Sequence, residues 1–211
     1  MSRIKIAIQG ELGAYSHIAA ERVYKGAEIK TCSTFEETFK QAYNDPDYKI
    51  VIPIENSLAG RVADIHYLFP KYKLQIHGEY FLPVEHNLLG KLDASIDDIK
   101  FVRSHAQAIS QCQNIISKKK FKPIISVDTA GSAKDLAEGT DKSIAAIASD
   151  LSAKMYNLKI LEKNIEDEKG NVTRFLIMGK NIEQPEYENN KKFITSCIFR
   201  VKSEPSALYK C

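Results

Sequence analysis

The sequence is poor in the residues that build metal sites and disulfide frameworks. Its four cysteines, Cys32, Cys112, Cys197 and Cys211, stand far apart, without a CxxC pair and without neighbouring pairs of histidines. This spacing predicts neither a zinc site nor a disulfide framework. The five histidines are scattered as well, so we expect no bound metal.

Long apolar runs and a strong net charge are also missing. No stretch approaches the roughly 18 consecutive apolar residues that indicate a transmembrane helix, and the opening residues MSRIKIAIQG lack the apolar core of a signal peptide. We therefore expect a cytoplasmic protein without a membrane partner. A net charge of +3 is too small to indicate a nucleic-acid partner, and the short lysine run at 118–120 is typical of a solvated helix end.

The chain does have an ordinary globular composition and a repeated alternation of strand-like and helix-like segments. Of its 211 residues, 44% are hydrophobic and 27% are charged, which suits one or two domains with apolar cores. The alternation favours an α/β fold with mostly parallel sheets. The predicted strands cover residues 3–9, 29–32, 48–54, 74–89 (one or two strands, interrupted at Pro83), 101–103, 123–127, 143–147, 159–165 and 173–178, and the predicted helices cover 16–24, 95–99, 107–117, 132–138 and 150–156, with one more after a capping box at 33–36.

The number of strands predicts two lobes rather than one sheet. The long segment 74–89 is a natural crossing into the second lobe, and the last strand would cross back. We place lobe 1 in residues 1–80 and 168–182, lobe 2 in 81–167, and a polar linker in 183–191. Small ligands bind in the cleft between such lobes, at the carboxyl ends of strands and the N-termini of helices.

Four strand–helix junctions carry more polar residues than a turn requires. They lie at residues 9–16, 54–60, 103–107 and 127–132, and Gln111 follows Gln107 by one helical turn on the same face. Each junction alone is typical of a helix N-cap. Together they would present hydroxyl, amide and backbone N–H donors to one space, which suits a carboxylate or phosphate. The first junction lacks GxGxxG spacing, so we do not expect a dinucleotide cofactor.

Arg174 raises a separate question, because it lies between Thr173 and Phe175 at the start of an apolar strand. Burying an unpaired charge costs several kcal/mol, so Arg174 needs an anionic partner or a route to solvent. The partner is either a structural carboxylate or a bound ligand.

Six stretches, in order along the chain, resemble the prephenate dehydratase family over residues 3–180. They are GELGAYSHIAA, IPIENSLAGRV, SHAQAISQC, DTAGSAKDLA, AAIASDLSAKMYNLKILEKNIED and NVTRF. Six ordered matches at natural spacing are far more specific than a single motif. One departure is Ala106, where the family usually has proline after Ser-His, and this change removes no functional group.

The resemblance implies a two-lobed α/β fold like that of type II periplasmic binding proteins. It also implies an enzyme that converts prephenate to phenylpyruvate by losing CO2 and hydroxide together, without a cofactor. By position, Thr173 resembles the essential hydroxyl of the family, and we expect it to assist departure of the ring hydroxyl. We expect Arg174 to hold a substrate carboxylate, Phe175 to form an apolar wall for the ring, and His105 to be structural. The other expected substrate-binding residues are Asn56, Ser104 and Gln111, supported by Glu55, Ser57, Asp128 and Thr129.

Two alternatives remain open from the sequence. Arogenate dehydratase is close, since arogenate differs from prephenate by an amino group in place of the keto oxygen. A non-catalytic two-lobed carboxylate-binding module is the alternative from another class, although the catalytic-motif matches argue against it.

The C-terminal residues 192–211 resemble the start of a regulatory ACT domain, which binds phenylalanine in the family. Because only that start is present, we expect activity that phenylalanine does not inhibit. We also expect a tail that is mobile or docked on another subunit of a homodimer or homotetramer.

Overall fold

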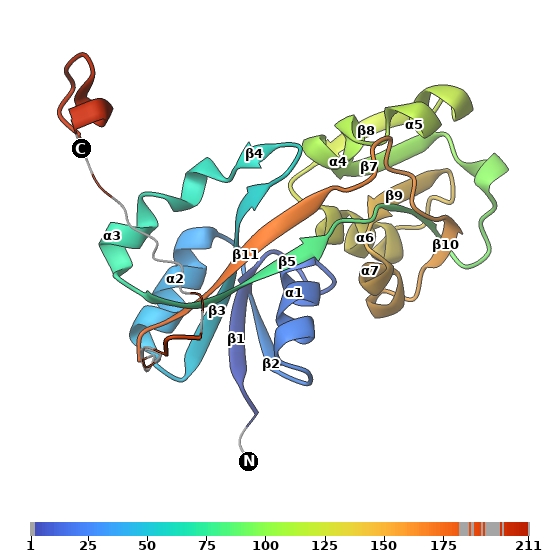
Figure 1. Cartoon of the computed structure of the whole chain (residues 1–211). Coiled ribbons are helices and arrows are strands. Elements are labelled where there is room, and N and C mark those ends of the chain that lie inside the picture. The colour runs from blue at the N-terminus through green and yellow to red at the C-terminus, as the bar shows by residue number, and fades with distance from the viewer. Residues whose placement is uncertain are drawn as a thin grey trace.

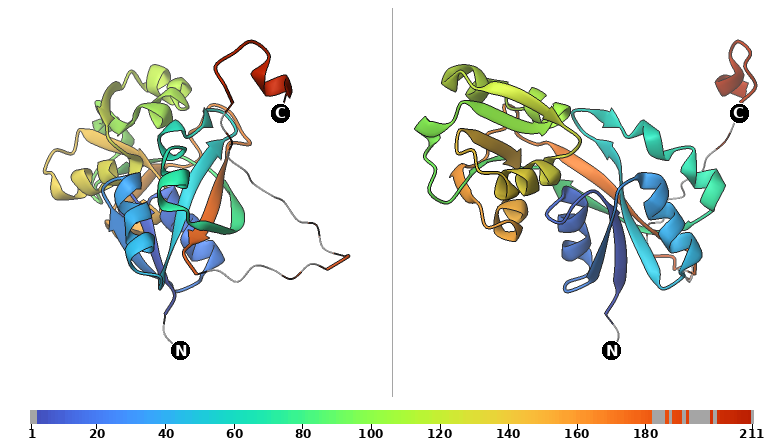
Figure 2. Two further views of the ribbon diagram at one scale, coloured as in Figure 1. Left: turned by 90° about the vertical axis from the view of Figure 1, so that its left-hand side faces the viewer. Right: turned by 180° about the vertical axis from the view of Figure 1, so that it is seen from behind.

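The protein folds into two α/β lobes, each built on its own sheet (Figure 1). The computed structural model describes residues 3–181, 186, 188–190, 192, 199 and 201–210. Two long strands, β5 and β11, run from lobe 1 toward lobe 2, and the view from behind shows the same crossing (Figure 2). Within the described residues, no helix combines the length and the apolar composition that crossing a membrane requires.

Lobe 1 contains a sheet of order β2-β1-β3-β11-β5, with the short β4 paired to β3. Its helices are α1, α2 and α3, together with one 3-10 turn, η1. The bounds are β1 Lys5–Gln9, α1 Tyr15–Val23, β2 Glu28–Cys32, α2 Phe35–Asn44, β3 Tyr48–Asn56, β4 Gly60–Arg61, η1 Ala63–Ile65, α3 Leu68–Tyr72, β5 Gln75–Pro83 and β11 Val172–Gly179.

Lobe 2 contains a sheet of order β10-β6-β9-β7-β8. The bounds are β6 Asn87–Gly90, η2 Ile96–Asp98, β7 Phe101–His105, α4 Ala106–Ser110, α5 Gln113–Lys119, β8 Lys122–Ser126, α6 Thr129–Glu138, β9 Ile144–Ala148, α7 Asp150–Met155 and β10 Lys159–Glu162.

The two sheets have the same plan. In each sheet, three parallel strands lie next to a fourth strand that enters from the other lobe and runs antiparallel to them. This crossing strand is β11 in lobe 1 and β6 in lobe 2. A fifth strand, β5 or β10, pairs with the crossing strand on its other side. This plan confirms the predicted two-lobed, type II periplasmic-binding-protein-like fold. The expectation of mostly parallel sheets is wrong, because a strand entering from the cleft side must run against the local parallel strands.

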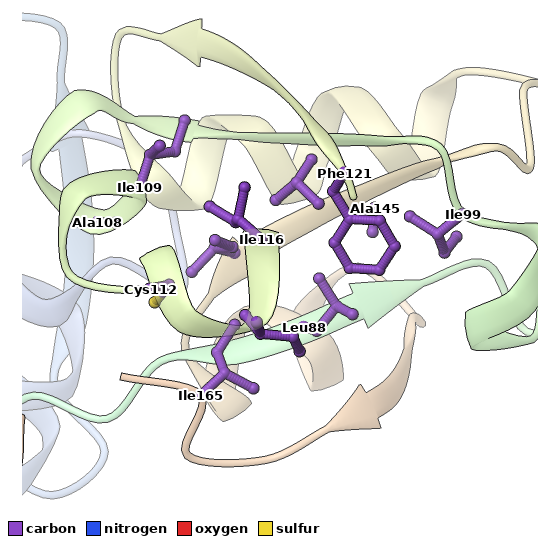
Figure 3. Packing of buried hydrophobic residues seen from close by; sticks show 12 residues of the cluster. Leu88, Ile99, Ala108, Ile109, Cys112, Ile116, Phe121, Ala145 and Ile165 are labelled. Atoms are coloured by element: carbon purple, nitrogen blue, oxygen red, sulfur yellow. The ribbon is translucent and has the colours of Figure 1, made fainter. Parts of the chain in front are cut away.

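Both faces of each sheet are covered, and this explains the apolar runs in the central strands. In β3, Ile50, Val51 and Ile52 are fully buried, with alternate residues belonging to the cores on opposite faces. Lobe 2 has two cores as well, and Figure 3 shows one of them, in which the side chains of Ile116 and Phe121 pack near Leu88. Each lobe therefore has enough buried apolar surface to hold its strand ends in fixed positions.

Several predicted elements differ from the structure in detail. The predicted helix at 107–117 is two short helices, α4 and α5, broken at Gln111 and Cys112. The capping interaction of α2 begins one residue later than predicted, because Thr34 Oγ1 accepts from the backbone N–H of Glu37 at 3.1 Å. The strand β4, the 3-10 turn η1 and the helix α3, which lie between residues 60 and 72, were not predicted. Of residues 192–211, which resemble the start of an ACT domain, 193–198, 200 and 211 lie outside the described residues. At 203–206 the chain bends and turns, and the 3-10 helix η3 begins only at Ala207–Lys210.

The lobes also contact each other directly through the loop before α1. The Gly13 carbonyl accepts hydrogen bonds from Ser149 Oγ at 2.6 Å and Ser152 Oγ at 3.0 Å, and the Leu12 carbonyl accepts one from the Tyr156 hydroxyl at 2.8 Å. Burial raises the pKa of Tyr156 to about 12, so its hydroxyl remains a donor. These bonds attach the start of α1 in lobe 1 to α7 of lobe 2.

Candidate active site

A cavity of about 430 Å³ lies between the lobes, and all four polar junctions reach it. This volume is within the range of small-molecule sites, roughly 300–1,000 Å³. The first and fourth junctions contribute most, with the ends of β1 and β8 and the starts of α1 and α6. The lining residues from the junctions are Gln9, Gly10, Ala14, Tyr15, Ser16, Asn56, His105, Gln107, Val127, Asp128 and Thr129.

The cavity offers backbone donors rather than cationic side chains. No side chain caps the N-terminus of α1, where Ala14 occupies the N-cap position. At α6 the N-cap residue Asp128 accepts from the backbone N–H of Gly131 at 2.6 Å, which leaves the earlier N–H groups of the first turn available. Among the described residues that line the cavity there is neither lysine nor arginine. An anion there would be held by the positive ends of helix dipoles.

Thr173 lies in the cavity wall and is held by Asn56 of the neighbouring strand. Asn56 Nδ2 lies 3.0 Å from Thr173 Oγ1, and both residues are buried. The register of β3 and β11 pairs these two positions directly. The carbonyl oxygen of the Asn56 amide accepts from the backbone N–H groups of Leu58 and Ala59 at 3.1 and 2.9 Å. A tight turn therefore fixes the side chain that positions Thr173.

Gln111 joins the site from lobe 2 through two residues that we did not predict. Its Oε1 lies 3.0 Å from His86 Nε2 and accepts from Asn171 Nδ2 at 3.0 Å. Asn171 Oδ1 in turn accepts from Asn56 Nδ2 at 2.6 Å. On the other side of the ring, His86 Nδ1 lies 2.8 Å from the hydroxyl of Tyr15. All of these side chains line the cavity.

No sequence pattern singles out these additional residues. His86 is one of five scattered histidines, Asn171 follows Gly170 in what resembles an ordinary turn, and Tyr15 is one aromatic residue within the first junction. Burial lowers the pKa of His86 from its usual 6.5 and raises that of Tyr15 well above 10.0. Both groups are therefore uncharged near neutral pH.

Arg174 lies outside this site. Alternation along β11 places Thr173 and Phe175 on the cavity side and turns Arg174 to the opposite face. There its Nε and Nη2 contact Glu79 Oε2 at 2.8 and 2.6 Å, and its guanidinium lies over the ring of Phe81. The expectation that Arg174 binds a substrate carboxylate is not supported by this geometry, which assigns it a structural ion pair.

Three other expected site residues lie behind the cavity wall rather than in it. Ser104 is fully buried, and its hydroxyl donates to the Ile147 carbonyl at 2.7 Å, which connects β7 to β9. Ser57 Oγ accepts from the Val172 N–H at 2.9 Å and so attaches the turn after β3 to the start of β11. Glu55 is exposed on the face that carries Arg174.

The remaining expected residues do line the cavity, and so does one that we expected to be structural. Phe175, Asp128 and Thr129 are part of its wall. His105 also lines it, and its Nδ1 accepts weakly from the Gln107 N–H at 3.3 Å. Among the described residues no three His, Cys, Asp or Glu side chains are grouped so as to hold a metal ion.

Comparison with known proteins places this chain in a protein family. Residues 6–183 match the family model described as prephenate dehydratase. An Arabidopsis thaliana relative, arogenate dehydratase/prephenate dehydratase 2, chloroplastic, is 38% identical over 99% of this chain and 54% of its own length. A bifunctional N-acyl-homoserine lactone acylase/prephenate dehydratase of Komagataeibacter europaeus is 38% identical over 97% of this chain and 73% of its own.

The fold is shared with solved structures as well. A structure titled GqqA, a novel type of quorum quenching acylases, aligns with a TM-score of 0.82 at 36% identity, covering 98% of this chain and 74% of that one. The present chain spans only about half the length of the plant relative, 54%.

Proposed function

Because this chain belongs to the prephenate dehydratase family, we propose that its cavity catalyses the loss of CO2 and hydroxide from prephenate to give phenylpyruvate. The observation that supports this most directly is the Thr173 hydroxyl, which faces the cavity and is held by a buried amide. Aromatisation of the ring drives the reaction strongly forward, so the site needs to position groups rather than supply an electron sink.

Thr173 has the role of assisting the leaving hydroxyl. Its Oγ1 accepts from Asn56, so its own proton is available to hydrogen-bond to the ring oxygen that departs as hydroxide. A positioned donor of this kind contributes typically about 10²–10⁴-fold to the rate. A threonine hydroxyl is a weak acid, so donation of a hydrogen bond is the form of assistance that its chemistry allows.

The site must bind the carboxylate that the product retains more strongly than the carboxylate that departs as CO2. The starts of α1 and α6 supply backbone N–H groups and dipole ends for the carboxylate that is retained. The departing carboxylate must not be over-stabilised, because its charge is lost in the transition state. The lack of lysine and arginine among the described lining residues is consistent with that requirement.

An apolar wall suits the ring of the substrate. Phe35, Val62, Val84 and Phe175 line the cavity, and Phe175 is 1% exposed. Phe35, Val62 and Phe175 belong to lobe 1, and Val84 directly follows β5, so this apolar surface lies mainly on one side of the cleft, where it suits the cyclohexadienyl ring.

Arogenate is a second candidate substrate, favoured by a specific observation. The carboxylates of Asp64 and Asp128 line the cavity, where no described cation competes for them. Either carboxylate can pair with the ammonium group that arogenate carries in place of the keto oxygen. Homo-oligomeric assembly remains part of the proposal, and light scattering of the purified protein would test it.

The experiment that tests the proposed function is a parallel assay with prephenate and arogenate. Purified protein should form phenylpyruvate from prephenate or phenylalanine from arogenate, and chromatography separates the two products. A reaction without protein is the control for spontaneous conversion. A folded wild-type protein that forms neither product above the level of this control would contradict the proposal and favour a carboxylate-binding module.

A further inference from the structure

The hydrogen bonds around Thr173 have a fixed direction, and the direction is set by the backbone. Asn56 Oδ1 accepts from the N–H groups of Leu58 and Ala59 at 3.1 and 2.9 Å. A backbone N–H can only donate, so the amide of Asn56 cannot be flipped. Its Nδ2 must therefore face the other way, toward Thr173 and Asn171.

This orientation passes from one side chain to the next. Asn56 Nδ2 donates at 2.6 Å to Asn171, which must present its Oδ1 and so turns its own Nδ2 to Gln111 at 3.0 Å. Gln111 must then present its Oε1. The ring atom of His86 that lies 3.0 Å from this oxygen is Nε2, and it must carry a proton to make the bond.

The far end of the chain completes the assignment. Burial lowers the pKa of His86, so the ring carries a single proton at neutral pH. With that proton on Nε2, Nδ1 is left as an acceptor. The Tyr15 hydroxyl lies 2.8 Å from Nδ1 and 2.8 Å from the Glu85 carbonyl oxygen, so its one proton is shared between these two acceptors. The near end is equally determined, since the second Nδ2 proton of Asn56 goes to Thr173 Oγ1 at 3.0 Å.

We propose that Asn171 and His86 are positioning residues for the reaction, acting through the directed chain that begins at the turn of residues 56–59. The chain holds Thr173 Oγ1 as an acceptor, so its only proton points into the cavity, and it holds His86 as the Nε2–H tautomer. Neutral amides do not relay protons, so the chain acts by orientation alone. This inference rests on the proposed function for its consequence in catalysis, although the tautomer of His86 can be tested without any substrate.

The first test is the tautomer itself. Nitrogen-15 and carbon-13 shifts of the His86 ring, measured by NMR on the full chain near neutral pH, should show protonation at Nε2 and a bare Nδ1. A His86 ring protonated at Nδ1 alone, or doubly protonated at pH 7, would overturn the proposal. Because no substrate is used, this result stands whether or not the protein is a dehydratase.

Two variants with the same chemical change give opposite expectations. In Asn171→Asp the new carboxylate still accepts from Asn56 but cannot donate to Gln111. Gln111 must then turn its amide nitrogen toward both neighbours, and the proton of His86 moves to Nδ1. In Gln111→Glu the carboxylate accepts from both neighbours, so Nε2 of His86 stays protonated. If both variants give the same His86 protonation, the chain has no directional effect.

Kinetics separate positioning from a structural role. Asn171→Asp should lower kcat about 10²-fold, the scale expected for misplacing a catalytic group by about 1 Å, while KM changes less than about threefold. The control Asn157→Asp makes the same change at an exposed position after α7 and should leave both constants unchanged. An Asn171→Asp protein with the shifted tautomer and a wild-type kcat would overturn the catalytic part of the proposal. If the wild-type protein is inactive on both substrates while Nε2 is protonated, the proposed function fails and the directed chain stands.

Discussion

The hydroxyl of Thr173 is the smallest group on which the proposed reaction depends, and its removal is the clearest test at the scale of a residue. Thr173→Val keeps the shape of this buried residue but deletes the donor. We expect kcat to fall about 10²-fold or more while KM changes little. Steady-state kinetics give both constants, and circular dichroism checks the fold. Thr38→Val is the matched control, since it also deletes a buried hydroxyl, one that donates to the Thr34 carbonyl at 2.9 Å and does not line the cavity. A kcat within threefold of wild type would remove Thr173 from the mechanism.

Arg174 gives the opposite expectation, because its guanidinium pairs with Glu79 and does not line the cavity. Arg174→Lys loses the planar fork that contacts one carboxylate oxygen through two nitrogens. Both side chains are more than a quarter exposed, at 28% and 27%, so solvent screens the pair and the loss of stability should be about 1 kcal/mol or less. We expect a slightly lower Tm with kcat and KM within twofold of wild type. A large rise of KM in a stable variant would instead return Arg174 to the binding site.

At the scale of an element, the loop before α1 attaches lobe 1 to lobe 2 through Gly13, where a side chain would clash with the other lobe. Gly13 has φ +90°, and a Cβ there would lie 2.6 Å from Ser152 Oγ and 2.8 Å from Ser152 Cα. Gly26 has a similar φ of +75° with nothing within 4 Å of its Cβ position. Gly26→Ala should therefore cost only backbone strain, about 1 kcal/mol. Gly13→Ala should cost about 1–3 kcal/mol more, because it also forces α7 away from the loop.

Urea unfolding of the two glycine variants measures the difference. The same displacement should reduce kcat in Gly13→Ala, since the loop leads directly into the start of α1 at the cavity. Equal losses of stability in the two variants would show that the contact with Ser152 is loose enough to relax.

At the scale of the whole molecule, two buried histidines connect stability to pH. Burial lowers the pKa of His17 and of His86 below 6.5, so the folded protein keeps both rings neutral. The unfolded chain protonates them as the pH falls through about 6.5, so unfolding takes up protons and stability decreases from there toward the lowered folded-state pKa values. Each proton contributes about 1.4 kcal/mol per pH unit. We expect the free energy of unfolding to fall between pH 7 and 5, with a smaller slope in His86→Gln. Identical slopes would show that His86 does not remain neutral in the fold.

Much of the architecture was predictable because it depends on short-range patterns. Alternating and fully apolar runs located most strands, and the capping box at 33–36 located the start of α2 to within one residue. The elements at 63–72 were missed because they are short and include Pro70, which interrupts a helical pattern. The antiparallel direction of β6 and β11 was missed because strand direction depends on where the chain re-enters a lobe, and no local pattern encodes that.

By itself, the sequence determined the family, the two-lobed fold and the convergence of four polar junctions, because the carboxyl ends of strands and the starts of helices meet at a cleft in this fold. Only the tertiary structure decided which of the polar residues act together. Period-two alternation separates Arg174 from its neighbours Thr173 and Phe175, but only the assembled sheet shows which face meets the cavity. The chain that links Asn56, Gln111 and Asn171 joins residues far apart in sequence. Hydrogen bonds of that kind depend on distances of about 3 Å between separate elements, which packing sets and local sequence does not.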